Sequence, residues 1–275
     1  MSGLCSLNEM VSTLSSVKEC KTNNMKFFDL NVPLEDSPSE PMPVKIVHQS
    51  HKESAAMMAS FFDASVDDLP NGLGWANDTV SLITHAGTHV DAPWHYYPTC
   101  EGKKSKTIDE LPLEWFYGDG VVIDMQHKEK GGLISTEDIQ AALEKINYTL
   151  KPKDIVLIHT GTDKLWGNPE YFNSGAGVSA AATHWLIDQG IKVMGIDTWG
   201  WDQPFWAQKE RFKKTGDASI IWEAHRVGKD KEYCQIEKLA NLDLLPKPFG
   251  FKVSCFPVKI KGASGGWTRV VAMFE

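Results

Sequence analysis

Apolar residues recur along this chain with two different spacings, and each spacing predicts one kind of element. The apolar runs at residues 120–125, 154–161 and 191–198 have the length and β-branched content of buried strands. Between them, residues 135–146 and 179–190 place apolar side chains at helical spacing. A strand–helix–strand–helix–strand order predicts parallel strands joined by right-handed crossovers.

Local signals mark the ends of both helices. Ser135 and Asp138 form a capping pattern at the start of the first helix, and Ser179 and Gly190 are expected to begin and end the second. The other strand signals share β-branched or aromatic content and lie at residues 25–34, 43–50 (the weakest), 79–85, 250–260 and 268–275. The predicted class is α/β, with a β-rich N-terminal part.

Composition predicts one globular domain. The chain has 275 residues, 42% of them hydrophobic, and no Pro/Gly/Ser-rich linker or charge run divides it. We expect a single domain over residues 26–275, preceded by a flexible extension at residues 1–25, in which little could form a core.

The net charge and the cysteine content indicate which kinds of partner and which cellular compartment to expect. A net charge of −8 disfavours nucleic acid and anionic membrane as main partners, so a small-molecule substrate is expected. The first 25 residues lack the apolar run that a signal peptide requires, and no apolar run approaches transmembrane length, so we expect neither feature. Its five cysteines are odd in number, widely spaced and without a CxxC pair, which predicts a reduced, cytoplasmic protein.

The densest chemistry lies in the segment HAGTHVDAPWH, which places three histidines and an aspartate in eleven residues. His85, His89, Asp91 and His95 would share one face of an extended chain, but the glycine and proline between them predict a strand end that turns. Imidazole and carboxylate groups suit Zn²⁺ or Mn²⁺, and three ligands would leave a coordination position for water, as in catalytic sites. The alternative is separate hydrogen-bonded histidines near a turn.

This segment resembles the HxGTHxDxPxH motif of the cyclase family of metal-dependent hydrolases, which includes bacterial kynurenine formamidase and isatin hydrolase. Residues 27–34, 195–198, 236–246 and 256–273 resemble further stretches of that family, so the likeness covers most of the chain from about residue 26. The resemblance implies a swivelling β/β/α fold, with a mixed sheet or barrel-like β core and flanking helices. Relatives in this family commonly form dimers or tetramers, so the resemblance also implies a homodimer or a homotetramer.

The resemblance also implies roles for the motif residues. His85, His89 and Asp91 would bind the metal, and His95 would be the catalytic acid/base. In members with two metals, the aspartate is shared, and a histidine and a glutamate twelve residues later complete the second position. His225 and Glu237 have that spacing here. The alternatives are an exposed loop histidine and a solvated glutamate.

One segment departs from compact formamidases. Residues 198–217 have no counterpart there, and they contain Trp199, Trp201 and Trp206. These tryptophans could roof a pocket for a flat substrate, pack in a dimer interface or fill a local core. We predict that Trp199 and Trp201 contact substrate together with Trp94, which is bulky where many members carry a smaller apolar residue.

A second polar segment, HTGTD at residues 159–163, follows a predicted parallel strand. Ligands often bind at that end of a strand in α/β proteins, although a structural role is the alternative for His159.

Together these features predict a hydrolase of a small amide, lactam, lactone or N-formyl compound. A divalent metal, Zn²⁺ or Mn²⁺ in one or two positions, would activate water as hydroxide for attack on the carbonyl, with His95 moving the proton. One alternative is a metal-dependent cyclase or dehydratase acting on a small metabolite with the same groups. The other is a metal-binding protein without enzymatic activity.

Overall fold

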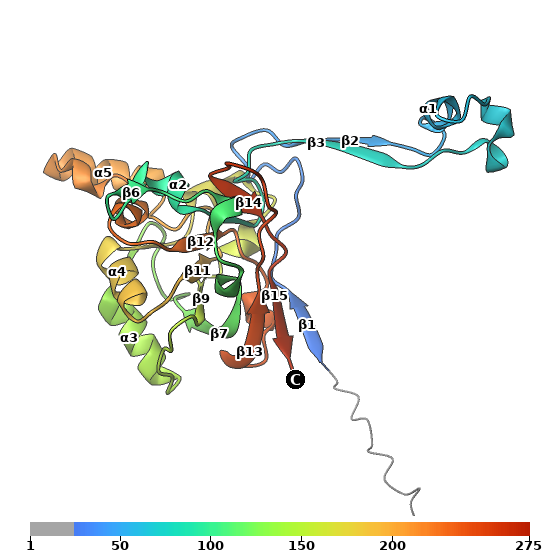
Figure 1. The fold of residues 1–275 in the computed structure, drawn as a ribbon. Coiled ribbons are helices and arrows are strands. Elements are labelled where there is room, and N and C mark those ends of the chain that lie inside the picture. Colours follow the sequence, from blue (N-terminus) through green and yellow to red (C-terminus); the bar gives the residue numbers. More distant parts are fainter. Residues whose placement is uncertain (1–24) are drawn as a thin grey trace, which may run out of the picture.

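A computed structural model describes residues 25–275, so the predicted extension lies, apart from Met25, outside the described residues. The body is built on a nine-stranded mixed sheet (Figure 1). In spatial order the strands are β1 (Lys26–Asp29), β15 (Val271–Phe274), β13 (Phe249–Ser254), β7 (Tyr117–Asp124), β9 (Ile155–His159), β11 (Val193–Ile196), β12 (Cys234–Glu237), β4 (His89–Asp91) and β14 (Gly265–Trp267).

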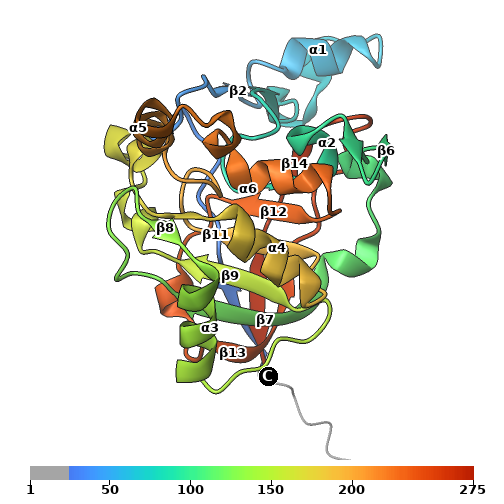
Figure 2. The ribbon, with the colours of Figure 1, turned by 90° about the vertical axis from the view of Figure 1, so that its left-hand side faces the viewer.

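The centre of the sheet is parallel, as the alternating pattern predicts. β7, β9, β11 and β12 pair in parallel, and the strands on both sides of them pair antiparallel. Helices α3 (Thr136–Lys145) and α4 (Ala180–Asp188) connect the parallel strands and cover one face of the sheet (Figure 2). The expected α/β class, with a mixed sheet and flanking helices, is therefore confirmed.

Both predicted helix starts are present. The Ser135 side chain accepts a hydrogen bond from the Asp138 amide, and the Asp138 carboxylate accepts one from the Ser135 amide. The Ser179 side chain accepts one from the Ala182 amide at the start of α4. These bonds satisfy amides that have no partner within the helix, which fixes where each helix begins.

Apolar side chains pack on both faces of the sheet. Val121 lies in the cluster under α3 and α4, and its neighbour Val122 lies in the cluster on the opposite face with Phe251. Successive side chains of a strand point to opposite faces, so a strand buried on both sides reads as a continuous apolar run. This is why residues 120–125 show no polar alternation.

A hairpin arm projects from the body (Figure 1). It consists of β2 (Lys45–Gln49) and β3 (Asn77–Ser81), paired antiparallel, with α1 (Ala55–Ser60) at its far end. Every residue of β3 is exposed. The two strand predictions in this region are confirmed, although β3 ends at Ser81 and leaves residues 82–85 outside the strand.

The remaining strands and helices are short, except for α5. They are β5 (Thr99–Cys100), β6 (Lys103–Lys104), β8 (Leu133–Ile134), β10 (Gly177–Val178), α2 (Pro93–Tyr96), α5 (Phe205–Thr215) and α6 (Glu223–Arg226). Within residues 25–275, no helix combines the length and the apolar character that crossing a bilayer requires.

Candidate active site

The histidine-rich segment folds as a turn, a buried strand and a short helix. His89 and Asp91 lie two residues apart on β4, so their side chains leave the same face of the strand. His85 precedes the strand, and His95 lies on α2, which begins at the proline. The two predicted bends, at Gly87 and Pro93, therefore lie on either side of a three-residue strand. At Gly87 the φ angle is +58°, and a Cβ atom would lie 2.6 Å from a Leu34 methyl, so only glycine fits.

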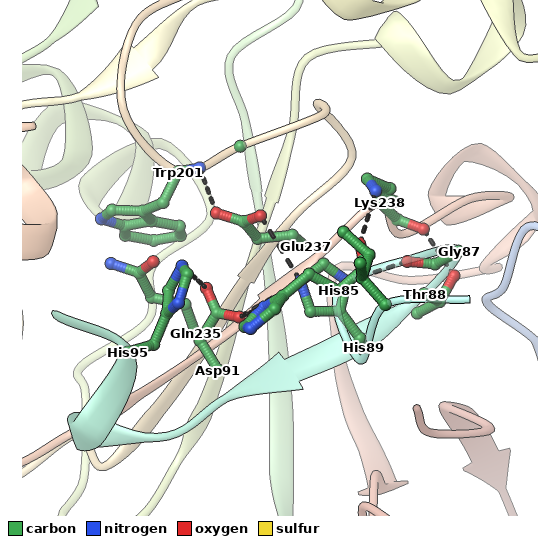
Figure 3. Close-up of polar contacts among 12 residues, drawn as sticks. His85, Gly87, Thr88, His89, Asp91, His95, Trp201, Gln235, Glu237 and Lys238 are labelled. Atoms are coloured by element: carbon green, nitrogen blue, oxygen red, sulfur yellow. Dashed lines mark hydrogen bonds and ion pairs between the residues drawn. The ribbon is translucent and has the colours of Figure 1, made fainter. Parts of the chain in front are cut away.

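Asp91 is the centre of this site, and it is fully buried (Figure 3). Its Oδ1 lies 2.7 Å from Nδ1 of His85 and 3.1 Å from Nε2 of His89. Its Oδ2 lies 4.0 Å from Nε2 of His95 and 3.6 Å from Nε2 of His225. One carboxylate thus faces four imidazoles, three of which come from the motif.

The second carboxylate comes from β12, which pairs with β4 so that Glu237 stands opposite His89. Its Oε2 is 3.6 Å from Nε2 of His89, and its Oε1 is 3.4 Å from Nε2 of His225. Oε1 also accepts a hydrogen bond from the Trp201 amide at 2.9 Å. Glu237 and His225 are both buried, which excludes a solvated glutamate and an exposed loop histidine. We call His85, His89, Asp91, His95, His225 and Glu237 the Asp91 cluster.

The Asp91 cluster has the donors and the unsatisfied atoms that a divalent cation requires. Nε2 of His89 and Oδ2 of Asp91 are buried without a hydrogen-bond partner. Two groups of possible ligand atoms, each lying within 4.8 Å of one another, share Asp91: one adds His85 and His95, the other His89 and Glu237. Mixed nitrogen and oxygen donors fit Zn²⁺ or Mn²⁺. His85 has protein partners at both nitrogens, because its Nε2 also lies 2.9 Å from the Ser264 hydroxyl.

The combined effect of burial and the neighbouring charges lowers the pKa values of Asp91 and His95. Burial would raise the pKa of Asp91, but the imidazoles of His95, His85 and His89 hold that pKa well below its usual range. Burial lowers the pKa of His95 to about 4 despite the attraction of Asp91, and the neighbouring histidines add to the decrease. His95 is therefore a neutral imidazole near pH 7, able to accept a proton.

His225 has the opposite protonation. Burial acts to lower its pKa, but hydrogen bonding to the carboxylates of Asp202, Asp91 and Glu237 raises that pKa well above the usual value. Asp202 contacts Nδ1 of His225, so Nε2 is the nitrogen that faces the cluster. This partner fixes the ring orientation, as outer groups do for histidines that bind metals.

A buried ion pair holds the loop before β4. Nζ of Lys238 donates to both carboxylate oxygens of Glu40 at 2.9 Å and to the His85 carbonyl at 2.7 Å. Glu40 also accepts a hydrogen bond from the Gly87 amide. Sequence reasoning missed this pair, because its partners are 198 positions apart and no local pattern links them.

A cavity opens above the Asp91 cluster. Its volume is about 150 Å³ without the open mouth. His85, His95, His225 and Glu237 contribute to its lining. Its apolar walls include Phe172, Trp199, Phe205 and Trp222.

The aromatic wall is an edge-to-face assembly. The Phe172 and Trp199 rings lie 4.7 Å apart at 84°, and the Trp199 and Phe205 rings lie 5.7 Å apart at 63°. Trp222, which sequence reasoning missed, stacks on His225 with ring centroids 4.3 Å apart and planes 5° from parallel. Its ring also lies 5.1 Å from that of His95. Aromatic side chains thus border the histidines on the cavity side.

The three predicted substrate-contacting tryptophans have different positions. Trp199 lines the cavity. Trp201 does not: its side chain is fully buried in the core and its indole N–H donates to Thr183, so that prediction is wrong. Trp94 is 38% exposed beside the Lys104 ammonium and is not part of the cavity wall, which also corrects the prediction. Of the three alternatives for this segment, a substrate pocket, a dimer interface and a local core, Trp201 therefore belongs to a local core.

Comparison with known proteins places these features in a family context. A family model described as "Putative cyclase" matches residues 28–203. "Cyclase-like protein 2" of Arabidopsis thaliana is 28% identical over 207 residues, which is 74% of this chain and 67% of that protein. "Kynurenine formamidase" of Salinibacter ruber is 26% identical over 125 residues, 43% of this chain and 50% of that enzyme.

A solved structure shares the whole fold. Isatin hydrolase A from Ralstonia solanacearum superposes with a TM-score of 0.72 at 24% identity, covering 92% of this chain and 93% of that one. The nine-stranded sheet, its helices and the position of β4 therefore belong to a known architecture.

Proposed function

This chain belongs to the putative cyclase family, and from that premise we propose that it is a metal-dependent hydrolase of a small amide, lactam, lactone or N-formyl compound. One observation carries the proposal: four imidazoles and two carboxylates converge at the inner end of an aromatic-walled cavity. Purely structural metal cages are closed, whereas catalytic sites keep a position open to the substrate.

We assign His85, His89 and Asp91 to one cation, and Asp91, His225 and Glu237 to a second, more weakly bound one, which would replace the proton on Nε2 of His225. Asp91 can serve both, because its two oxygens face different histidines. A bound Zn²⁺ or Mn²⁺ polarises a substrate carbonyl and lowers the pKa of a coordinated water toward about 7. For His85, ligation means giving up its hydrogen bond to Asp91 or to Ser264.

We assign the acid/base role to His95. Its depressed pKa keeps the ring neutral at pH 7, and its side chain lines the cavity rather than the core. It can take a proton from the attacking water and return one to the leaving nitrogen or oxygen, help that is typically about 10²- to 10⁴-fold. Asp91, 4.0 Å from its Nε2, stabilises the imidazolium formed between these transfers.

The walls favour a flat, largely apolar substrate. Trp199, Phe172 and Phe205 present edges and faces to the cavity, a surface suited to an aromatic ring. The kynurenine formamidase and isatin hydrolase among the relatives point in the same direction, because their names indicate an aryl formamide and a fused cyclic amide. We therefore propose N-formyl aryl amines and aromatic cyclic amides as the first compounds to test.

The test is a panel of such compounds, with lactones added, assayed on metal-free protein before and after addition of Zn²⁺ or Mn²⁺. We expect turnover that requires metal, and product carboxylate labelled when the reaction runs in ¹⁸O water. The cyclase names of the relatives favour one alternative, a dehydrating cyclisation, which would leave the carboxylate unlabelled. Bound metal without turnover of any compound would instead support a non-enzymatic metal-binding protein.

We further propose that the protein forms a homodimer or homotetramer through the hairpin arm. Phe61 and Phe62 are 70% and 66% exposed near its far end, and Val47 and Val80 on its strands are about half exposed. A lone two-stranded hairpin is marginally stable in water, so this arm needs a covering surface. A buried aromatic side chain covers about 150–250 Å². The exposed parts of the two Phe side chains would supply roughly 200–350 Å² of the roughly 800 Å² that each partner contributes to a standard interface, so the strands of the arm would have to supply most of the rest.

Light scattering during size-exclusion chromatography tests this assembly. The unmodified protein should elute as a dimer or tetramer, and Phe61→Ser combined with Phe62→Ser should shift it to monomer. Leu113→Ser is the control, since Leu113 is 69% exposed outside the arm. A monomeric unmodified protein would contradict the proposal.

The compartment stays a prediction. Cys100, Cys234 and Cys255 are buried free thiols, in keeping with a reducing, cytoplasmic location. Fractionation of source cells with an antibody would test it.

A further inference from the structure

A second group of buried titratable side chains lies at the ends of neighbouring parallel strands. His159 is the last residue of β9, Asp197 directly follows β11, and Asp163 lies in a 3₁₀ helix, Thr162–Leu165, after β9. We call these three residues the Asp197 cluster. None of them lines the cavity above the Asp91 cluster.

The three side chains converge and are almost completely buried. One possible ligand atom from each lies within 4.8 Å of the others, and Nε2 of His159 is 4.0 Å from Oδ2 of Asp197. His159 is 5% exposed, Asp163 7% and Asp197 0%. Nε2 of His159 and Oδ1 of Asp163 are both buried without a hydrogen-bond partner. Leaving buried polar atoms unsatisfied is unfavourable, so a missing partner is indicated.

Other contacts hold the two carboxylates in place without using these atoms. Asp197 accepts hydrogen bonds from the Thr160 and Gly161 amides. Oδ2 of Asp163 accepts one from the Asn241 amide and lies 3.3 Å from Nζ of Lys164. Both contacts involve Oδ2, so Oδ1 of Asp163 is the oxygen that has no partner.

The charges in the Asp197 cluster are not balanced by its cationic neighbours. Of the two carboxylates, Asp163 is the one that faces an ammonium among the described residues, and that ammonium, Nζ of Lys164, is closer to the exposed carboxylate of Asp243, at 2.7 Å, than to Asp163. Lys164 is itself half exposed, so solvent screens its charge. Buried carboxylates of this kind call for a paired cation or a coordinated metal.

We propose that His159, Asp163 and Asp197 form a further divalent-metal site, which takes Zn²⁺ through Nε2 of His159 and one oxygen of each carboxylate, with water completing the shell. Zinc bonds of about 2.0–2.2 Å require the three atoms to approach one another by roughly an ångström, which side-chain rotation can supply. Thr160 and Gly161, whose amides contact Asp197, are only half-buried, so the cluster lies close to the protein surface.

The site would act on structure rather than on catalysis. It joins the segment after β9 to the end of β11, two residues before Trp199 in the cavity wall. A metal that binds only the folded chain stabilises it by mass action. Zn²⁺ should therefore raise the melting temperature through this site even when the Asp91 cluster cannot bind metal.

Zinc-edge anomalous diffraction on crystals of the full chain soaked in Zn²⁺ tests the site directly. We expect one anomalous peak in contact with His159, Asp163 and Asp197, separate from any peak at Asp91. A peak at Asp91 with none at His159 would overturn the proposal. This outcome leaves the proposed hydrolase function intact, because the two clusters are scored separately in one map.

A solution measurement adds a matched control. In an Asp91→Ala background, which removes the carboxylate common to the other metal positions, equilibrium dialysis should retain about one Zn²⁺ per chain. Adding His159→Asn should remove it and its melting-temperature increment, whereas adding His127→Asn, at an exposed histidine, should not. Retention of that Zn²⁺ after His159→Asn would overturn the assignment. If the background variant fails to fold, the anomalous map of the unmodified chain decides.

Discussion

The Asp91 cluster and the Asp197 cluster have similar side chains but different surroundings. Both combine histidine and carboxylate groups in the interior, and both contain a histidine Nε2 without a hydrogen-bond partner. The Asp91 cluster opens into a cavity with aromatic walls. The Asp197 cluster does not line that cavity, and its Asp197 carboxylate accepts hydrogen bonds from backbone amides directly after β9. Ligand chemistry alone therefore does not indicate catalysis; access for a substrate does.

The two clusters are also held in different ways. Asp197 is held by hydrogen bonds from amides of the segment directly after β9. This strand pairs with β11, the strand that Asp197 follows. The loop carrying His85 is fixed by Lys238 and Glu40, which come from distant parts of the chain. A site assembled from distant segments depends on the whole fold, so its supporting residues should affect both stability and turnover.

The largest effect is expected for Asp91→Ala. This carboxylate faces all four histidines of its cluster, so its loss should remove metal from both proposed positions and reduce turnover to the rate without protein. Metal analysis and the assay on the active compound measure this. Asp188→Asn, on the exposed side of α4, is the control. Full metal content with normal turnover in Asp91→Ala would show that the Asp91 cluster is not the catalytic one of the two clusters.

The next effect is expected for His95→Gln. The neutral imidazole would be lost while His85, His89 and Asp91 remain, so turnover should fall by about 10²- to 10⁴-fold with the metal retained. Stopped assays and metal analysis on the same sample separate the two quantities. Loss of metal from a folded His95→Gln protein would make this residue a ligand instead of the acid/base.

A smaller effect, mainly on stability, is expected for Lys238→Met. It leaves the Glu40 carboxylate buried without its partner, which should lower the free energy of unfolding by about 3–5 kcal/mol. Denaturant unfolding measures this change. Adding Glu40→Gln should recover part of the loss, because the unpaired charge is then removed. Equal stability of Lys238→Met and the unmodified protein would show that this pair does not hold the loop.

The smallest effect is expected for Asp197→Asn. It weakens the hydrogen bonds from Thr160 and Gly161, which end on a charged acceptor, by about 1.5–3 kcal/mol in total. Thermal unfolding should detect this loss, and turnover per folded molecule should change far less than in Asp91→Ala. A loss of turnover as large as that of Asp91→Ala would place the Asp197 cluster in the catalytic machinery.

Several features could be predicted from the sequence because their signals are local. Ser135 and Ser179 mark helix starts by hydrogen bonds that span three residues, and the apolar runs of β7, β9 and β11 reflect burial on both faces. The histidines and aspartate of residues 85–95 are brought together by one short strand and its two bends. Such features depend on chain geometry over a few residues, so the residue types within a short stretch are enough to predict them.

Other features were decided by contacts between distant segments. β12 has only four residues, and its pairing with β4 is what places Glu237 opposite His89. Trp199 and Trp201 differ by two positions, yet one lines the cavity and the other is in the core with Thr183. The pairing of Lys238 with Glu40 has no local signal either.

The physical reason is the range over which each property is fixed. Hydrogen bonds of a cap and the side-chain alternation of a strand are set within a few residues, so the sequence determined the parallel centre of the sheet and the motif at residues 85–95. Burial, and the direction in which a side chain meets its partners, depend on which segments pack together. Only the tertiary structure therefore decided that Glu237 and His225 join Asp91, and that the Asp91 cluster opens into the cavity whereas the Asp197 cluster does not line it.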